Sequence, residues 1–223
     1  MLRRTVLSLL TAGSLAAPAV ARSQAWSHPS FQPPRTAIRE FNFAVAQADG
    51  PGTTLLFQWR EESGPRNQLS LDAGIADSDV ENAELMLFVG GQYAFQMSRS
   101  SPDVPMDFLF TAGAYLAVGD FTLFRFPVGV SVGHRFELED AMALTPYVHP
   151  RLSIDLCNNC RGDDNDSDVA VTFDLGLDFE VTRMVAIRAA AIFAGNDSFD
   201  HDGFGVSVAW TPPWLARSPR HGR

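Results

Sequence analysis

The chain has 223 residues, of which 26 are acidic and 17 basic, so its formal net charge is −9. One domain is the expectation for this length, and nucleic-acid binding is excluded as a main function because phosphate neutralisation needs a basic face. After the first 25 residues no window approaches the roughly 20 consecutive apolar residues that a membrane-spanning helix requires.

The first 25 residues (1–25) are predicted to be a cleaved secretory signal peptide. Two arginines, Arg3 and Arg4, precede an apolar stretch, and small residues suited to cleavage follow at Ala21 and Ala25. Removal of this segment leaves 14 basic and 26 acidic residues, a formal net charge of about −12. The mature chain is therefore expected to be exported and strongly acidic.

Residues 26–36 are predicted to be an irregular lead-in to the folded domain. They carry Pro29, Pro33 and Pro34, and proline interrupts both helices and strand ladders. The lead-in shows no hydrophobic periodicity, so no regular element is expected there.

Period-two alternation dominates residues 37–210. In residues 169–181 every odd position from Val169 to Val181 is apolar, whereas the even positions include Asp174 and Asp178. Successive side chains of a strand point to opposite faces, so this segment has one wholly apolar face. The same pattern predicts ten strands, at about 37–47, 54–61, 68–76, 83–97, 107–118, 121–138, 143–156, 169–181, 184–194 and 203–210.

These segments predict an all-β fold, a closed antiparallel up-and-down transmembrane β-barrel of ten strands over residues 37–210. A barrel of eight strands is the alternative, because the first two segments have the weakest patterns. Only helices and closed barrels satisfy their backbone groups in lipid, and bacterial single-chain barrels have even strand numbers. Residues 211–223 are then a C-terminal tail.

A soluble sandwich or a lipocalin-like barrel also alternates, with its apolar face turned inward. Here the apolar faces carry almost no charge, and aromatic residues fall near strand ends, as at Trp59, Phe193 and Trp210. Aromatic girdles of this kind flank the apolar band of membrane barrels, so the apolar faces are predicted to face lipid. Pro146 and Pro150 predict that the strand at 143–156 is bulged or irregular.

The last predicted strand carries Gly205, Val208 and Trp210, an alternation of apolar and aromatic residues near the end of the chain. In this respect residues 37–210 resemble the small outer-membrane β-barrel family, the porin-type OmpA/OmpX-like barrels, whose final strand is read by the barrel-assembly machinery. The chain departs from the family in the tail that follows Trp210. The resemblance implies the outer membrane of a Gram-negative bacterium, contact with its lipid and lipopolysaccharide, and the assembly machinery as a folding partner; it implies no activity.

Many charged residues have the parity of the lumen-facing side. Buried charges must be paired, so the favoured interpretation is a lumen plugged by salt-bridged side chains, and the alternative is a narrow charge-lined pore. The residues in question are Arg60, Arg125, Arg135, Arg151 and Arg188, with Asp72, Glu84, Asp155, Asp174, Asp178 and Glu180.

We expect no catalytic residues, no cofactor and a non-enzymatic role that is structural, adhesive or that of a very narrow conduit. The alternative is an outer-membrane hydrolase with a site at the outer rim, of the lipid A deacylase or omptin kind. His149 and Ser153 share a strand face, but residues four apart on a strand are too far apart for a nucleophile and its base. Acidic residues and a histidine in two connections are a faint echo of the omptin site: Asp77 with Asp79, and Asp200, His201 and Asp202.

Cys157 and Cys160 are the only cysteines, and an exported pair is expected to form a disulfide. No metal site is predicted from them. Three connections are acidic, and carboxylates are the ligands that Ca²⁺ and Mg²⁺ prefer, so weak divalent-cation binding at the outer rim is a hypothesis. The acidic residues are Asp77, Asp79 and Glu81; Asp163, Asp164, Asp166 and Asp168; and Asp197, Asp200 and Asp202.

Overall fold

The computed structural model describes residues 27–48, 52–77, 85–158, 165–195 and 201–216. The predicted signal peptide, residues 1–25, lies outside these ranges, as do Cys160 and Glu84. None of the described helices is long and apolar enough to cross a membrane.

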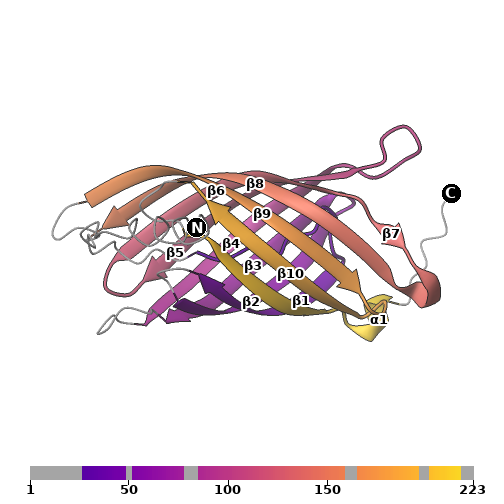
Figure 1. Ribbon diagram of the computed structural model, residues 1–223, viewed down its shortest axis with the longest axis horizontal. Helices are drawn as coiled ribbons and strands as arrows, with labels where there is room; N and C mark the ends of the chain where they lie inside the picture. Colours follow the sequence, from indigo (N-terminus) through magenta and orange to yellow (C-terminus); the bar gives the residue numbers. More distant parts are fainter. Residues whose placement is uncertain (1–26, 49–51, 78–84, 159–164, 196–200, 217–223) are drawn as a thin grey trace, which may run out of the picture.

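Ten antiparallel strands close into a single barrel (Figure 1), so the predicted fold and strand number are confirmed. Closure is made by β1 with β11, where Phe41 lies opposite Trp210, and by β6 with β8. A two-residue piece, β7, pairs with the start of β8 and continues the wall formed by β6. The strands are β1 Arg39–Ala48, β2 Gly52–Gly64, β3 Asn67–Asp77, β4 Met86–Ser98, β5 Asp107–Val118, β6 Thr122–Gly133, β7 Phe136–Glu137, β8 Ala143–Asn158, β9 Asn165–Glu180, β10 Val185–Ala194 and β11 Gly203–Trp210; η1 is Glu139–Ala141 and α1 is Pro213–Ala216.

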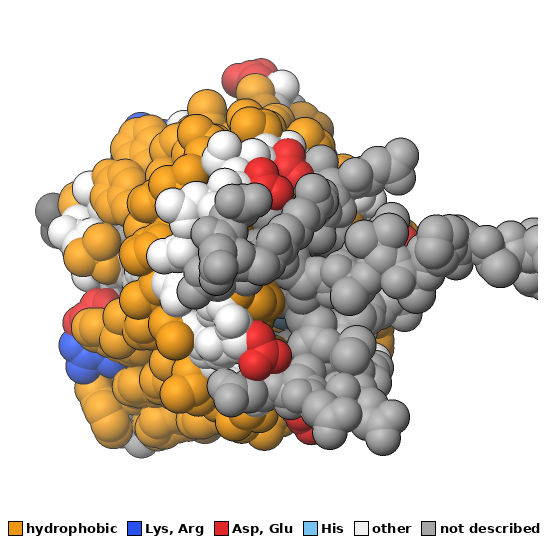
Figure 2. Space-filling model, turned by 90° about the vertical axis from the view of Figure 1, so that its left-hand side faces the viewer, with side chains coloured by type: hydrophobic (Ala, Val, Ile, Leu, Met, Phe, Trp, Pro, Cys, Tyr) orange, Lys and Arg blue, Asp and Glu red, His pale blue; other side chains and the backbone are white. Residues whose placement is uncertain are grey.

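The apolar faces of the strands point outward. In β9 the side chains of Val171 and Leu175 are 57% and 51% exposed, whereas Asp174 between them is fully buried. Figure 2 looks on to one end of the barrel and shows hydrophobic side chains over much of its outer surface, on the left and the lower edge of the view. A soluble barrel or sandwich would turn this face inward, so the lipid-facing interpretation is confirmed and the soluble alternatives are wrong.

The barrel has two distinct ends. We call one the loop end; it carries the connections 49–51, 78–85, 119–121, 159–164 and 195–202. We call the other the terminus end, because β1 begins there and β11 finishes there, next to α1 (Figure 1). The predicted connection at 157–168 is shorter than expected, because β8 and β9 extend to Asn158 and Asn165.

Two local expectations are corrected. β8 is an unbroken strand of 16 residues despite Pro146 and Pro150, and its pairing with β6 keeps one register from Gly129 to Gly133. Both prolines face outward, and the register of β8 with β6 and with β9 does not shift, so the strand is not bulged. The strand expected at 121–138 is instead split: β6 ends at Gly133, and β7 begins at Phe136 after a gap of two residues.

Candidate functional site

The lumen of the barrel is occupied by the N-terminal part of the described chain. Residues 27–34 are all buried, and Phe31 and Gln32 are 0% and 1% exposed. We call residues 27–37 the N-terminal plug. The segment is irregular, as the sequence predicted, but it fills the lumen rather than merely leading into the barrel. The salt-bridged side chains predicted in the lumen are therefore joined there by a segment of backbone that was not predicted.

The plug runs along the barrel from one end to the other. At the loop end, the Ser27 hydroxyl donates to the carbonyl of His201 at 2.9 Å. At the terminus end, the Ala37 amide donates to Oε1 of Gln68 at 2.7 Å, and the chain then turns into β1. The chain preceding β1 thus crosses the whole lumen before the first strand begins.

Ser30 joins opposite walls of the barrel. Its hydroxyl donates to Oδ2 of Asp174 on β9 at 2.7 Å and lies 2.8 Å from Nδ1 of His149 on β8. From the other side, Arg60 on β2 donates to the carbonyl oxygens of Ser30 and Phe31 at 3.1 and 2.9 Å. Strand β2 lies across the barrel from β8 in the strand order, so one plug residue spans the lumen.

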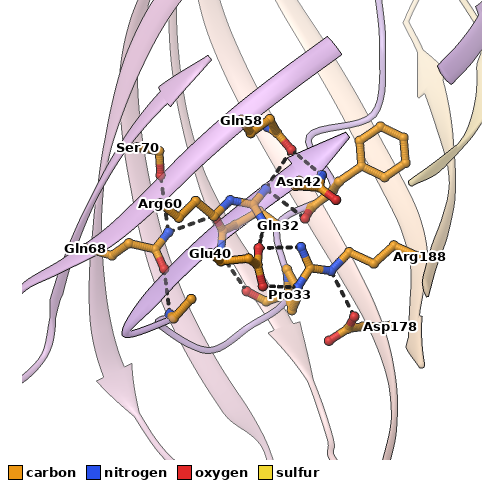
Figure 3. Close-up of polar contacts among 12 residues, drawn as sticks. Gln32, Pro33, Glu40, Asn42, Gln58, Arg60, Gln68, Ser70, Asp178 and Arg188 are labelled. Carbon is orange, nitrogen blue, oxygen red and sulfur yellow. Dashed lines mark hydrogen bonds and ion pairs between the residues drawn. The ribbon is translucent and has the colours of Figure 1, made fainter. Parts of the chain in front are cut away.

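Gln32 makes a second bridge nearer the terminus end. The Ser131 hydroxyl on β6 donates to the Gln32 carbonyl at 2.7 Å. On the other side, the Gln68 side chain on β3 donates to Oε1 of Gln32 at 3.2 Å (Figure 3). Farther along the plug, the Gln96 side chain donates to the carbonyl of Pro34 at 2.9 Å. Side chains of the wall therefore take the place of a neighbouring strand for the plug backbone.

The wall of the lumen is lined by buried ion pairs. Arg188 donates to both oxygens of Glu40 at 2.7 Å and to Asp178 at 2.8 Å, and Glu40 also accepts from Arg60 (Figure 3). A similar pair joins Arg125 on β6 to an oxygen of Asp155 on β8 at 2.6 Å. Each charge is compensated, as a buried charge must be to avoid an unmet desolvation cost.

The lumen-facing charges predicted from strand parity lie where they were expected, except Glu84, which lies outside the described residues and stays a prediction. Arg60, Arg125 and Arg188 are buried in the lumen with Asp72, Asp155, Asp174 and Asp178; Arg151 is 14% exposed and pairs with Asp174; Arg135 pairs with Glu180 near the terminus end. Two lumen carboxylates were missed, Glu40 and Asp107. The parity of Phe41, which faces outward, would have placed Glu40 inside.

Ser30, His149 and Asp174 form a Ser–His–Asp set that was not predicted. In a catalytic triad the serine and the aspartate contact different nitrogens of the imidazole. Here Ser30 Oγ and Asp174 Oδ2 both face Nδ1, at 2.8 and 3.7 Å, and Nε2 faces the Thr111 hydroxyl at 2.9 Å. The Ser30 hydroxyl donates its hydrogen bond to the Asp174 carboxylate and not to the imidazole. The side chains of His149 and Asp174 are both fully buried. The geometry is that of an anchor for the plug.

Among the other hydrolase candidates, His201 and Asp202 are held in structural contacts. Ser153 lies four residues beyond His149 on β8 and faces the lumen. The His201 amide donates to Ser27 Oγ, and Asp202 accepts a hydrogen bond from the Ala194 amide at 2.7 Å. Of the omptin-like residues, Asp79 and Asp200 lie outside the described residues. Among the described residues, no group of three or more His, Cys, Asp or Glu is arranged to hold a metal ion.

Cys157 is buried near the end of β8 and takes part in a disulfide. The other cysteine of the chain is Cys160, which lies outside the described residues, so the Cys157–Cys160 pairing stays a prediction.

A cavity of about 190 Å³ opens at the terminus end, between the plug and the wall. Its lining mixes both charge signs, with Arg35, Arg135 and Arg188 beside Asp178 and Glu180. Four of the arginines in its lining are held in ion pairs: Arg35 with Asp107, Arg60 with Glu40, Arg135 with Glu180, and Arg188 with Asp178. The cavity is therefore a vestibule in front of the plug.

A closed antiparallel barrel, an outward apolar band and a polar lumen together define an integral protein of the Gram-negative outer membrane. The predicted location and the class of small outer-membrane barrel are thus confirmed, and the narrower OmpA/OmpX-like resemblance stays a prediction.

No protein-family model matches this sequence, and no curated protein matches it. Among solved structures, the chain is similar to the KdgM porin, with 10% identity and a TM-score of 0.41 over 78% of this chain and 99% of that one. It is also similar to LpxR from Salmonella typhimurium, with 8% identity and a TM-score of 0.48 over 78% and 100% of the two chains. For Neisserial surface protein A the identity is 10% and the TM-score 0.31, over 77% and 94%. At these values the likenesses carry no inference about function.

Proposed function

We propose that this protein is a non-enzymatic outer-membrane barrel that is closed in its resting state, with a structural or adhesive role at the cell surface. The observation that carries the proposal is the N-terminal plug, which is buried in the lumen from residue 27 to residue 34. An open porin needs a continuous aqueous lumen, whereas here the Arg60 guanidinium reaches the plug backbone and closes the passage.

The loop end is proposed to face outward. The support is the position of the three acidic connections predicted to face outward, all of which lie at the loop end; loop length does not separate the ends, because the connections 99–106 and 134–142 of the terminus end are as long. Contact with lipopolysaccharide and weak binding of divalent cations are the partners that such a rim would suit. Gly205, Val208 and Trp210 on β11 are the proposed contact for the assembly machinery.

Recording from planar lipid bilayers tests the closed state. The full mature chain, refolded and checked by heat-modifiable gel migration, is expected to give little or no steady conductance. Large, stable channel openings would contradict the proposal. Turnover of lipid A or of peptide substrates by the same refolded protein would favour the hydrolase alternative instead.

A further inference from the structure

The wall contacts of the lumen run around the barrel, whereas the plug contacts run across it. Arg125 on β6 pairs with Asp155 on β8, and these two strands are neighbours. The hydroxyl of Tyr115 on β5 donates to Asp72 on β3, and only β4 lies between these strands. Ser30, by contrast, joins β2 to β8 and β9. The wall charges therefore keep these partners when the plug is absent, and the space that the plug fills is left open.

The plug is held by separate polar contacts and contains a strained residue. Phe31 has a φ of 49°, in the left-handed region that bulky side chains rarely adopt. Such a conformation persists only where its surroundings impose it, and here the Arg60 contact with the Phe31 carbonyl does so. Release of the plug would relieve this strain, which lowers the cost of opening.

We propose that residues 27–36 are a displaceable gate and that the lumen behind them is a narrow passage for small cations. The inference rests on the closed resting state proposed above. The passage is expected to be about as wide as its present occupant, a single irregular peptide segment.

The net charge of the lumen lining after removal of the plug determines which ions the passage prefers. Arg35 of the plug donates to Asp107 at 2.8 Å, and the Asp107 side chain is fully buried, so removal of the plug leaves this carboxylate without that cation. The lining then holds four arginines against six acidic residues, a balance that attracts cations. These residues are Arg60, Arg125, Arg151 and Arg188, with Glu40, Asp72, Asp107, Asp155, Asp174 and Asp178.

The test is a variant that lacks residues 27–36, refolded and recorded in planar bilayers under a KCl gradient. We expect steady conductance with a reversal potential shifted toward that of K⁺. A synthetic peptide of residues 27–36 should block this current, and a scrambled peptide of the same composition should not. Asp107→Asn in the same background should reduce the cation preference.

A folded deletion variant that stays closed, or a current that the peptide does not block, would overturn the gate. Conductance of the full chain at rest would instead overturn the proposed closed state, so the two failures are distinguishable. If the deletion variant does not fold, the full-length double variant Ser30→Ala with Gln32→Ala tests the gate instead. It should open at least tenfold more often than the unmodified chain, and Ser101→Ala, in the 99–106 connection, should not. A double variant that stays closed would also overturn the gate.

Discussion

Arg188 shows what the buried charges of the lumen contribute. It is 4% exposed and binds the carboxylates of Glu40 and Asp178. Loss of one partner from a buried pair leaves an uncompensated charge, at a cost of about 3–5 kcal/mol. Arg188→Met is expected to lower the free energy of unfolding by that amount, as measured by urea denaturation in lipid vesicles.

The matched control is Arg39→Met. Arg39 pairs with Glu61 at the rim, and both side chains are about one third exposed. Exposed pairs contribute about 1 kcal/mol or less, so this variant should unfold almost as the unmodified chain does. Equal effects at Arg39 and Arg188 would show that the lumen pairs do not stabilise the barrel.

Phe31 allows a separate test of backbone strain. In most positions glycine is less stable than alanine by about 0.5–1 kcal/mol, because it loses more backbone freedom on folding. At a φ of 49° this order should reverse, since glycine adopts positive φ without a steric penalty. Phe31→Gly is therefore expected to be more stable than Phe31→Ala in the same urea assay.

Phe88 provides the comparison for this reversal. It is 3% exposed, lies within β4 and has no positive φ. There, Phe88→Gly should be less stable than Phe88→Ala. If the two positions show the same order, the Phe31 conformation stores no strain.

Among the elements, the N-terminal plug solves a backbone problem that the strands do not have. A segment inside a lumen has no partner strand, so wall side chains must satisfy its amide and carbonyl groups. Pro29, Pro33 and Pro34 reduce the demand because proline has no amide proton. Glutamine side chains supply much of the rest, as Gln68 and Gln96 do. The prolines that made this segment look like a linker are what suit it to the lumen.

The β8–β9 hairpin carries the remaining prediction, on divalent cations. Asp166 and Asp168 lie at the loop end of β9, and each carboxylate accepts a hydrogen bond from the amide that follows it. Weak Ca²⁺ binding, with a dissociation constant on the order of 10⁻³ M, is expected where several acidic groups lie close together at the rim. Calorimetric titration should show this binding in the unmodified protein and lose it when Asp163, Asp164, Asp166 and Asp168 are changed to Asn.

The control for this titration is Glu137→Gln with Glu139→Gln, at the terminus end of the barrel. It also removes acidic charge but should leave the binding unchanged. If the Asn variant titrates as the unmodified chain does, the hairpin is only a charged surface.

At the scale of the whole molecule, ten strands enclose more space than the wall side chains fill. A barrel of eight strands has an interior that side chains fill, and the diameter grows with strand number. The extra width accommodates one extended segment, and the plug directly precedes β1, which closes the barrel against β11. The closing strand and the plug are therefore consecutive parts of the same chain.

The sequence by itself determined the barrel, its lipid-facing surface and most of its lumen charges. The physical reason is local: a strand alternates its side chains between two faces, so one apolar residue such as Val171 or Leu175 fixes the side of its neighbour Asp174. This rule placed Arg60 and Arg188 inside without knowledge of their partners.

Only the tertiary structure decided the place of the N-terminal plug. Residues 27–37 have no periodicity, and nothing in their local sequence indicates whether they lie in water or in a lumen. Ser30 meets His149 and Asp174 across separations of 119 and 144 residues. Such contacts exist only once the barrel has closed, because closure is what brings β2, β8 and β9 around one segment.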